Sequence, residues 1–238
     1  MSQGYRNESD NRIKKSGVVY IIRIHAQFLI MAVAYFIAAG SLNIGRAWLY
    51  FGIAAVTYFV SSLILIKNNP GLINERAKKR ENTKSWDKAL LSLYLLIGFL
   101  GTHIVAGLDS RFEWSNMDMI YIIPGAVLYI VAAYIQIISM LANKYFEATV
   151  RIQSDREQQL VKDGPYKIVR HPGYASVFMS FTAIPFMIGS FYALICTAAV
   201  FIIMFTRTAL EDITLQKELP GYSQYSEEVK FKLIPGIW

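Results

Sequence analysis

Apolar stretches long enough to cross a membrane alternate with short polar segments along most of this chain. A helix needs about 20 apolar residues to cross the hydrocarbon of a bilayer, and four stretches meet that length, at residues 24–42, 48–66, 89–108 and 119–141. Pro124 and Gly125 lie near the start of the fourth stretch, where we expect them to kink or ease the helix without ending it. The pattern predicts four transmembrane helices in this part of the chain.

A fifth apolar run, residues 174–207, is too long for one crossing. As a straight helix it would extend roughly 50 Å, against a hydrocarbon core of about 30 Å. Pro185 and the Gly189-Ser190 pair divide it, which predicts a helical hairpin with arms at 174–187 and 191–207. The predicted fold class is therefore an all-α integral membrane protein with about four transmembrane helices followed by a C-terminal helical hairpin.

Composition and charge agree with a membrane protein and set its expected orientation. Hydrophobic residues make up 54% of the chain and charged residues 17%, which excludes an ordinary soluble domain. The net charge of +7 resides in the polar segments 1–20, 67–88 and 142–173, whereas segment 109–118 is acidic apart from Arg111. The excess of bases predicts a cytoplasmic N-terminal tail and cytoplasmic loops, and argues against a nucleic-acid partner. Contact of the loop at 76–88 with anionic lipid headgroups is a second interpretation.

Single polar residues inside the predicted spans say less about function than the polar segments do. His25 at the edge of the first span is typical of a hydrogen-bonded interfacial histidine, while for His103, deep in the third span, a functional role and a buried interhelical hydrogen bond both stay open. Cys196 is the lone cysteine, which excludes an internal disulfide. The three histidines lack the spacing of metal ligands, and the sequence contains neither a GxGxxG Rossmann fingerprint nor a Walker loop.

The segment 164–174 is a polar turn region at the mouth of the last apolar run. The turn dipeptides Gly164-Pro165 and Pro172-Gly173 bracket Tyr166, Arg170 and His171. Polar side chains held between two rigid turns beside a hydrophobic helix predict a site at the membrane surface.

The far end of the hairpin carries a second polar cluster. Arg207 and Glu211 lie four residues apart and share a helix face, an arrangement that by itself is also typical of a helix-end ion pair. Because the hairpin returns the segment 207–212 to the surface that holds Arg170 and His171, we expect both clusters to face one pocket. The tail 208–238 breaks at Pro220-Gly221 and then places Tyr222, Tyr225 and Val229 on one helical face, which predicts a tail folded against the membrane domain.

These motifs together resemble the isoprenylcysteine carboxyl methyltransferase family, which is related to the membrane phospholipid methyltransferases. The resemblance covers about 95 residues, from Asn143 onward, and the first 140 residues match it only loosely, through Asn69-Pro70-Gly71-Leu72, Arg76 and Trp86-Asp87. The matching residues, in order, are Gly164-Pro165-Tyr166, Arg170-His171-Pro172, Tyr174, Arg207, Glu211-Asp212, Leu219-Pro220-Gly221-Tyr222, Tyr225 and Leu233-Ile234-Pro235-Gly236. Where many relatives have two consecutive glutamates, this chain has Glu211-Asp212.

The resemblance implies a single membrane methyltransferase domain over residues 1–238, with transmembrane helices in 1–140 and a cofactor-binding and catalytic core in 141–238. It implies S-adenosylmethionine as the cofactor, bound on the cytoplasmic side, and a hydrophobic or lipidated acceptor, such as an isoprenylcysteine-type carboxylate, entering from the membrane lipids. The implied catalytic residues are Arg207 and Glu211. The implied cofactor-binding residues are Gly164, Pro165, Tyr166, Arg170, His171, Pro172, Tyr174, Glu211, Tyr222 and Tyr225.

Two other functions stay open at the level of sequence. Sterol-type reductases, which use NADPH, have a similar fold and an Arg-His-Pro loop, but there an asparagine usually precedes the tyrosine, whereas this chain has Gly173. A non-enzymatic membrane scaffold or transporter would predict ionisable residues at the bilayer midplane or an internal repeat, and His103 is the one such residue in the spans. The acceptor atom, the role of the first two spans and the oligomeric state are not determined by the sequence.

Overall fold

The computed structural model describes residues 12–78 and 82–238, and within these residues all regular secondary structure is helical. Five of the described helical stretches are long and apolar enough to cross a membrane: Lys15–Ala39 (α1), Gly45–Asn68 (α2), Ser85–Phe112, Met119–Ala142 and Ala193–Glu218 (α8). The shorter apolar helix Pro172–Ile188 (α7) pairs with α8. The predicted all-α membrane fold, including the C-terminal hairpin, is confirmed.

Several of these stretches are built from more than one element. The stretch Ser85–Phe112 consists of α4 (Ser85–Tyr94), a π-helical segment η2 (Leu95–Gly101) and α5 (Thr102–Phe112), and Met119–Ala142 consists of the short η3 (Met119–Tyr121) and α6 (Ile122–Ala142). The remaining elements are α3 (Pro70–Arg76), η4 (Ser154–Arg156), η5 (Gly164–Lys167) and α9 (Tyr222–Glu228).

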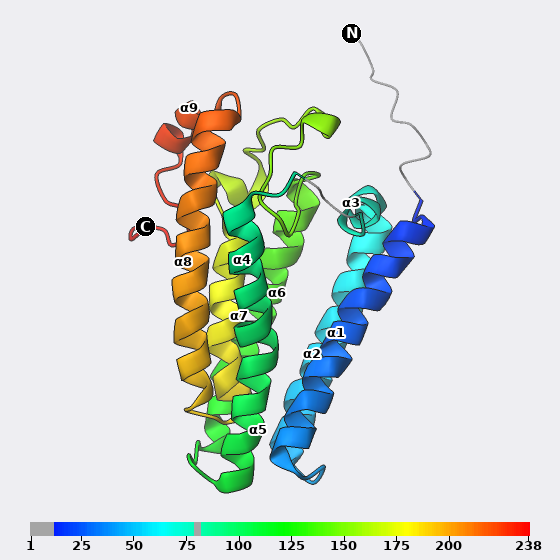
Figure 1. Cartoon of the computed structure of the whole chain (residues 1–238), viewed down its shortest axis with the longest axis vertical. Helices are drawn as coiled ribbons and strands as arrows, with labels where there is room; N and C mark the ends of the chain where they lie inside the picture. The colour runs from blue at the N-terminus through cyan, green and yellow to red at the C-terminus, as the bar shows by residue number, and fades with distance from the viewer. Residues whose placement is uncertain (1–11, 79–81) are drawn as a thin grey trace.

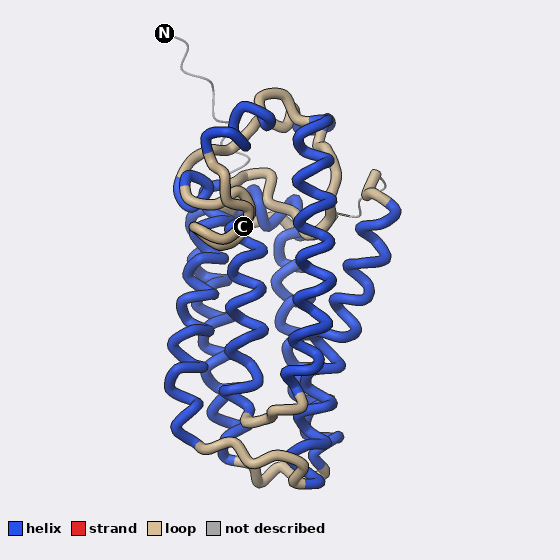
Figure 2. The backbone as a smooth tube through the Cα atoms, turned by 90° about the vertical axis from the view of Figure 1, so that its left-hand side faces the viewer, coloured by secondary structure: helices blue, strands red, loops and turns tan. Residues whose placement is uncertain are grey.

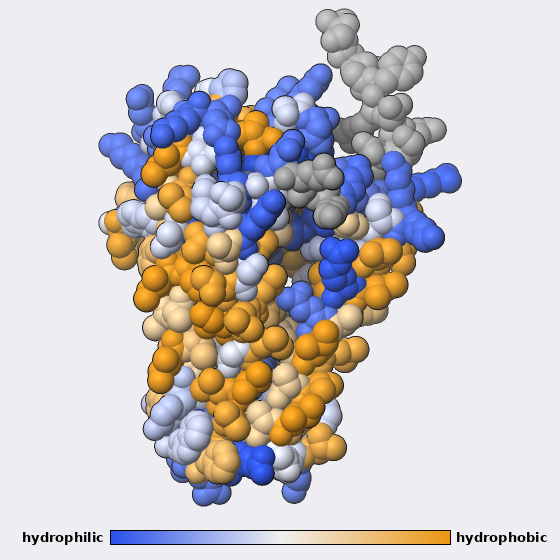
Figure 3. Space-filling view, in the orientation of Figure 1, coloured by the Kyte–Doolittle hydropathy of each residue, from blue (hydrophilic) through white to orange (hydrophobic). Residues whose placement is uncertain are grey.

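The long helices run side by side along the long axis of the molecule, and the α1–α2 pair leans away from the other helices at one end (Figure 1). That end holds α3, α9 and the long irregular segments, while the opposite end holds short turns (Figure 2). Hydrophobic residues cover the middle of the molecule, and hydrophilic ones gather at the loop-rich end (Figure 3). This distribution is that of a multi-pass membrane protein whose polar chemistry is concentrated at one membrane surface.

Glycine allows a close contact between α1 and α5. A Cβ at Gly107 of α5 would lie 2.5 Å from the carbonyl oxygen of Tyr35 in α1, so a larger residue would force the two helices apart. Small residues at such contacts let membrane helices approach closely enough for van der Waals packing, which replaces the hydrophobic effect inside a bilayer. Gly107 therefore fixes α1 against α5.

The turn between α7 and α8 forms at the predicted position. Of the two sites expected to interrupt the helix, Pro185 and Gly189-Ser190, only Gly189-Ser190 ends it. Pro185 lies inside the last turn of α7, where its carbonyl accepts hydrogen bonds from the N–H groups of Gly189 and Ser190. Gly189 has a φ of 88°, a left-handed conformation that glycine adopts without steric cost. Pro124 likewise lies in the first turn of α6, where its missing N–H costs no hydrogen bond.

The structure shows helix within the segments 1–20 and 67–88, which the hydropathy pattern assigns to a polar tail and a polar loop. Helix α1 begins at Lys15, nine residues before the predicted span. The prediction missed these residues because hydropathy detects only the part of a helix that lies in the membrane. The loop 67–88 contains α3, whose start is capped by the Asn69 side chain accepting a hydrogen bond from the Leu72 N–H at 3.2 Å. The bases Arg6, Lys79 and Arg80, which contributed to the predicted orientation, lie outside the described residues.

Two histidines of the spans, His103, whose role was open, and His25, expected to be hydrogen-bonded, both form hydrogen bonds. The Tyr50 hydroxyl lies 2.9 Å from Nε2 of His103, and Nδ1 of His103 lies 2.6 Å from the Phe99 carbonyl oxygen, so His103 joins α2 to the π-helical region. His25 bonds to the Ile21 carbonyl oxygen at 2.9 Å. His103 thus has the structural role of an interhelical hydrogen bond in this fold.

Arg46 joins three segments at the end opposite the loops. Its guanidinium donates to the carbonyl oxygens of Met187 at 3.1 Å and Phe186 at 2.6 Å, both in the last turn of α7, and to those of Met117 and Asp118 before η3. Carbonyl groups at a helix end have no partner within the helix. Arg46 supplies that partner and ties the start of α2 to α6 and α7.

We expect Arg46→Ala to lower the thermal unfolding midpoint of the detergent-purified protein markedly, because it leaves these carbonyl groups without a donor, and hydrogen bonds to a charged group contribute about 1.5–3 kcal/mol each. Arg111→Ala is the matched control, since Arg111 is exposed at the same end. Equal midpoints for the two variants would contradict the role given to Arg46.

Candidate functional site

A pocket lies at the loop-rich end, directly above the membrane-spanning part of α7 and α8. Its walls come from the irregular segment 143–161, the start of α7, the last turns of α8 and α9. Eight of the predicted site residues line it: Tyr166, Arg170, His171, Pro172, Tyr174, Glu211, Tyr222 and Tyr225. The structure therefore brings the Arg170-His171 pair and Glu211 to one cavity, whereas Arg207 and Asp212 of the second cluster are not among its lining residues.

Three predicted residues are placed outside the pocket wall. Gly164 and Pro165 begin the short helix η5, where Gly164 has a φ of 60° and turns the chain toward Tyr166. Arg207 is 3% exposed and is not among the lining residues. These three residues therefore lie beside the pocket without lining it.

Asp212 is the centre of a buried polar network beside the pocket. Its carboxylate, 2% exposed, accepts two hydrogen bonds from the guanidinium of Arg170, at 2.8 and 2.9 Å, and one from the Tyr222 hydroxyl at 2.8 Å. Nε2 of His171 lies 3.2 Å from the same carboxylate. The network joins α8, the Arg-His-Pro loop and α9, so these elements reach the pocket in a fixed relation.

The pKa values in this network follow from burial and from the Asp212 carboxylate. Burial, followed by the neighbouring negative charge, raises the pKa of Tyr222, so its hydroxyl remains a hydrogen-bond donor over the neutral range. Burial opposes the charged form of Arg170, but its hydrogen bonds and its attraction to Asp212 outweigh that and raise its pKa. Arg170 and Asp212 therefore form a charged pair whose charges compensate each other.

Arg207 forms the second buried ion pair of the region. Its Nε donates to Asp87 of α4 at 2.6 Å, its Nη2 donates to the Ala148 carbonyl oxygen, and its guanidinium lies 5.4 Å from the centroid of the Tyr174 ring. Asp87 also accepts the Val150 N–H at 2.8 Å. The pair thus fixes the chain at 148–150, which forms one wall of the pocket, and Arg207 takes its partner from α4 instead of from Glu211.

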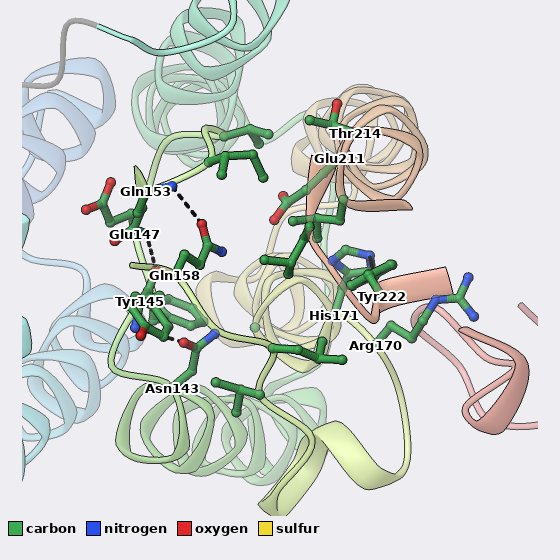
Figure 4. Close-up of a pocket in the computed structure, with 18 of the residues that line it drawn as sticks. Asn143, Tyr145, Glu147, Gln153, Gln158, Arg170, His171, Glu211, Thr214 and Tyr222 are labelled. Carbon is green, nitrogen blue, oxygen red and sulfur yellow. Dashed lines mark hydrogen bonds between the residues drawn. The ribbon is translucent and has the colours of Figure 1, made fainter. Parts of the chain in front are cut away.

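Glu211 is the acidic side chain of α8 that faces the pocket. The Tyr174 hydroxyl donates to its carboxylate, and the Tyr174 ring stacks on His171 with centroids 5.7 Å apart and planes at 9°. Figure 4 shows Glu211 pointing into the cavity from α8, whereas the Arg170 side chain points away from it. Among the described residues, Glu211 forms no direct ion pair, although the charge of Arg207, one turn earlier on α8, attracts it.

Hydrogen bonds within the segment 143–161 shape the opposite wall. Gln153 Nε2 donates to the Tyr145 carbonyl oxygen at 2.6 Å, the Gln153 N–H donates to Oε1 of Gln158 at 2.8 Å, and the Tyr145 N–H donates to Oδ1 of Asn143 at 2.8 Å (Figure 4). Arg151 is held between Glu147 at 3.0 Å and Asp155 at 2.6 Å. This wall presents amide groups, and Arg151, the arginine of the segment that lines the pocket, is neutralised by two carboxylates.

Sequence reasoning missed several residues that build the pocket. Asp212 entered only as a departure from the double glutamate of relatives, and Asp87 only as part of a loose match, although both are buried anchors. The signal for Asp212 was its position beside Glu211 on the returning helix. No short-range signal pairs Asp87 with Arg207, which lies 120 residues further along the chain.

The fold and the site together define a helical membrane protein with a polar, aromatic-walled pocket at one membrane surface. Residues 117–220 match the model of the phospholipid methyltransferase family. The match covers α6, α7 and α8 and confirms the resemblance to this group of membrane methyltransferases. None of the curated proteins compared with the chain matches it significantly. Membership of this family would imply a membrane methyltransferase whose substrates are lipids or other membrane-associated molecules.

We expect Asp212→Asn to destabilise the protein strongly, because it leaves the Arg170 charge buried without compensation, and breaking a buried pair in this way costs about 3–5 kcal/mol. Tyr225→Phe is the control: it removes one hydrogen bond, at 2.7 Å to the Tyr166 carbonyl oxygen, for about 1 kcal/mol. Thermal unfolding of both purified variants measures the difference. If Asp212→Asn unfolds at the wild-type temperature, Asp212 does not organise this region.

Proposed function

We propose that the protein is an S-adenosylmethionine-dependent methyltransferase that binds its cofactor in this pocket, on the cytoplasmic side, and methylates a lipid-like or isoprenylcysteine-type carboxylate. The observation that carries the proposal is the placement of Glu211. A half-buried carboxylate that forms no direct ion pair among the described residues faces a cavity walled by tyrosines, at the loop-rich end of the apolar helices α7 and α8.

The side chains of the pocket suit this cofactor chemically. S-adenosylmethionine carries positive charge on its sulfonium and amino groups, two ribose hydroxyls and a flat adenine ring. Glu211 offers a negative acceptor, Gln158 and Thr214 offer polar atoms, and the rings of Tyr145, Tyr222 and Tyr225 offer apolar faces. Carboxylates accept hydrogen bonds from hydroxyl or ammonium groups and attract cations, while aromatic rings stack on an adenine.

The charge of the pocket also separates this proposal from the reductase alternative. NADPH carries several phosphates, which proteins bind with free arginines, lysines or helix N-termini. The two arginines that line this pocket, Arg151 and Arg170, are both neutralised by carboxylates, and no lysine is among the described lining residues. A cationic cofactor therefore fits the pocket better than a polyanionic one.

The protein's contribution to methyl transfer would be alignment and exclusion of water. The cofactor supplies an electrophilic methyl group on sulfur, and a carboxylate acceptor is already ionised at neutral pH, so no general base is needed. Tyr174, which is bonded to Glu211, also packs against the apolar core of the membrane domain. Tyr174 would shield the cofactor from the bilayer and leave open only the path by which the acceptor enters.

Arg207 would act as a positioning residue in this scheme. Its bonds to Asp87 and to the Ala148 carbonyl oxygen hold the 148–150 wall, and its charge lies against the ring of Tyr174. Glu211 would contact the cofactor directly, through its amino or ribose groups. His171 and Pro172 would line the adenosine end with Tyr222 and Tyr225.

We expect Glu211→Gln to weaken binding of S-adenosylmethionine about tenfold or more, which corresponds to about 1.4 kcal/mol, because it removes the negative charge while keeping an oxygen to accept the Tyr174 hydroxyl. Isothermal titration of the detergent-purified protein measures the affinity. Glu218→Gln on the same helix is the matched control, since Glu218 is 43% exposed and pairs with Lys84 outside the pocket. Wild-type affinity in Glu211→Gln would contradict the assignment.

A further inference from the structure

The segment Leu233–Trp238, which follows α9, projects apolar side chains outward beside α8. Ile237 is 77% exposed and Ile234 41% exposed, whereas Leu233 is buried in the main apolar cluster. The segment closes on itself through hydrogen bonds from the N–H groups of Leu233 and Ile234 to the Trp238 carbonyl oxygen, at 2.8 and 3.0 Å. Two large apolar side chains on a closed turn are costly in water and call for an apolar neighbour.

Contacts with α8 place this segment at the level of the membrane-spanning helices. The Trp238 ring lies 5.1 Å, centroid to centroid, from the ring of Phe205, which is 39% exposed on the apolar part of α8. Nζ of Lys232 lies 4.7 Å from the centroid of the Trp238 ring. Figure 1 shows the chain end on the outer side of α8, away from the other helices. A tryptophan with a lysine beside it, next to a lipid-facing phenylalanine, is typical of the interfacial layer of a bilayer.

The residues just before this segment hold the Arg-His loop of the pocket. The N–H groups of Arg170 and His171 donate to the carbonyl oxygens of Phe231 and Lys232 at 3.0 and 2.9 Å. The Arg170 guanidinium also donates to the carbonyl oxygens of Val229 and Lys230, at 2.7 and 3.0 Å. The strap 229–232 therefore connects the outward-facing segment to the pocket through backbone hydrogen bonds.

We propose that Leu233–Trp238 is a bilayer anchor: Ile234, Ile237 and Trp238 insert into the interfacial layer of the membrane, and this contact holds the strap 229–232 against Arg170 and His171. The occupant of this surface is the lipid bilayer, because the surface continues the lipid-facing side of α8. Membrane contact thereby supports the shape of the pocket. The insertion of the segment into the membrane does not depend on the proposed function. The effect of that insertion on cofactor binding does rest on the proposed function.

The anchor is tested by the fluorescence of Trp238 in a variant that keeps it as the sole tryptophan, Trp48→Phe/Trp86→Phe/Trp114→Phe, reconstituted in phosphatidylcholine vesicles. Lipids brominated near the glycerol end of the acyl chain should quench its emission by about half and more strongly than lipids brominated near the chain middle, as expected for an interfacial residue. Strong quenching by aqueous iodide, with little effect of brominated lipid, would overturn the anchor.

The coupling to the pocket is tested by Ile237→Asp in lipid nanodiscs, with S-adenosylhomocysteine as the titrated ligand. We expect about fivefold weaker binding than wild type, because a charge is expelled from the interfacial layer and pulls the strap with it. Ile237→Leu is the matched control and should bind like wild type. Since Ile237 is exposed, both variants should fold, and their thermal unfolding confirms it.

Equal affinities of Ile237→Asp and wild type would overturn the coupling even if Trp238 is quenched by lipid. A wild-type protein that binds no ligand would instead contradict the proposed function, and the quenching experiment would still decide whether the anchor exists.

Discussion

The carboxylate of Asp212 is the group on which the arrangement of the loop-rich end depends. A charge that is 2% exposed inside a helical bundle requires full compensation, and here it comes from two separate parts of the chain: Arg170 and His171 in one loop, and Tyr222 in α9. Each partner can reach Asp212 only if the Arg-His-Pro loop and α9 lie against the end of α8. The pocket is the space left between these elements and the segment 143–161.

Three charged residues of α8 lie between Arg207 and Asp212, and two of them are buried in ion pairs with other elements. Arg207 pairs with Asp87 of α4, and Asp212 pairs with Arg170. Glu211 lies between them in the chain and turns its carboxylate into the cavity. Two buried pairs thus fix the rotation of α8 and thereby the direction of the one side chain that we assign to the cofactor.

Most of the membrane architecture could be predicted from the sequence, because apolar length is a direct physical requirement of the bilayer. The hairpin followed from a run too long for one crossing, and Gly189 ends its first arm as expected. The extension of α1 to Lys15 could not be predicted in this way, since helix outside the membrane carries no hydropathy signal. The capped start of α3 had a local signal in Asn69-Pro70 that the basic charge of the surrounding loop obscured.

The sequence predicted most of the residues that build the site, but not which of them form buried ion pairs and which face the pocket. Spacing placed Arg207 and Glu211 on one face, yet it could not show that Asp87 would neutralise Arg207, because that pairing joins α4 to α8 through tertiary packing. Asp212, which stands where many relatives have a second glutamate, has a side chain shorter by one methylene group. In the structure it receives both nitrogens of Arg170 at 2.8 and 2.9 Å, so the short side chain suits its buried partners.

The central claim is that this pocket binds a cationic methyl donor. Its most direct test is calorimetric titration of the wild-type protein in detergent with S-adenosylmethionine and, separately, with NADPH. We predict micromolar binding of S-adenosylmethionine, equivalent to about 8 kcal/mol, and no measurable binding of NADPH. Binding of NADPH alone would rule out a methyl-donor pocket and favour the reductase alternative.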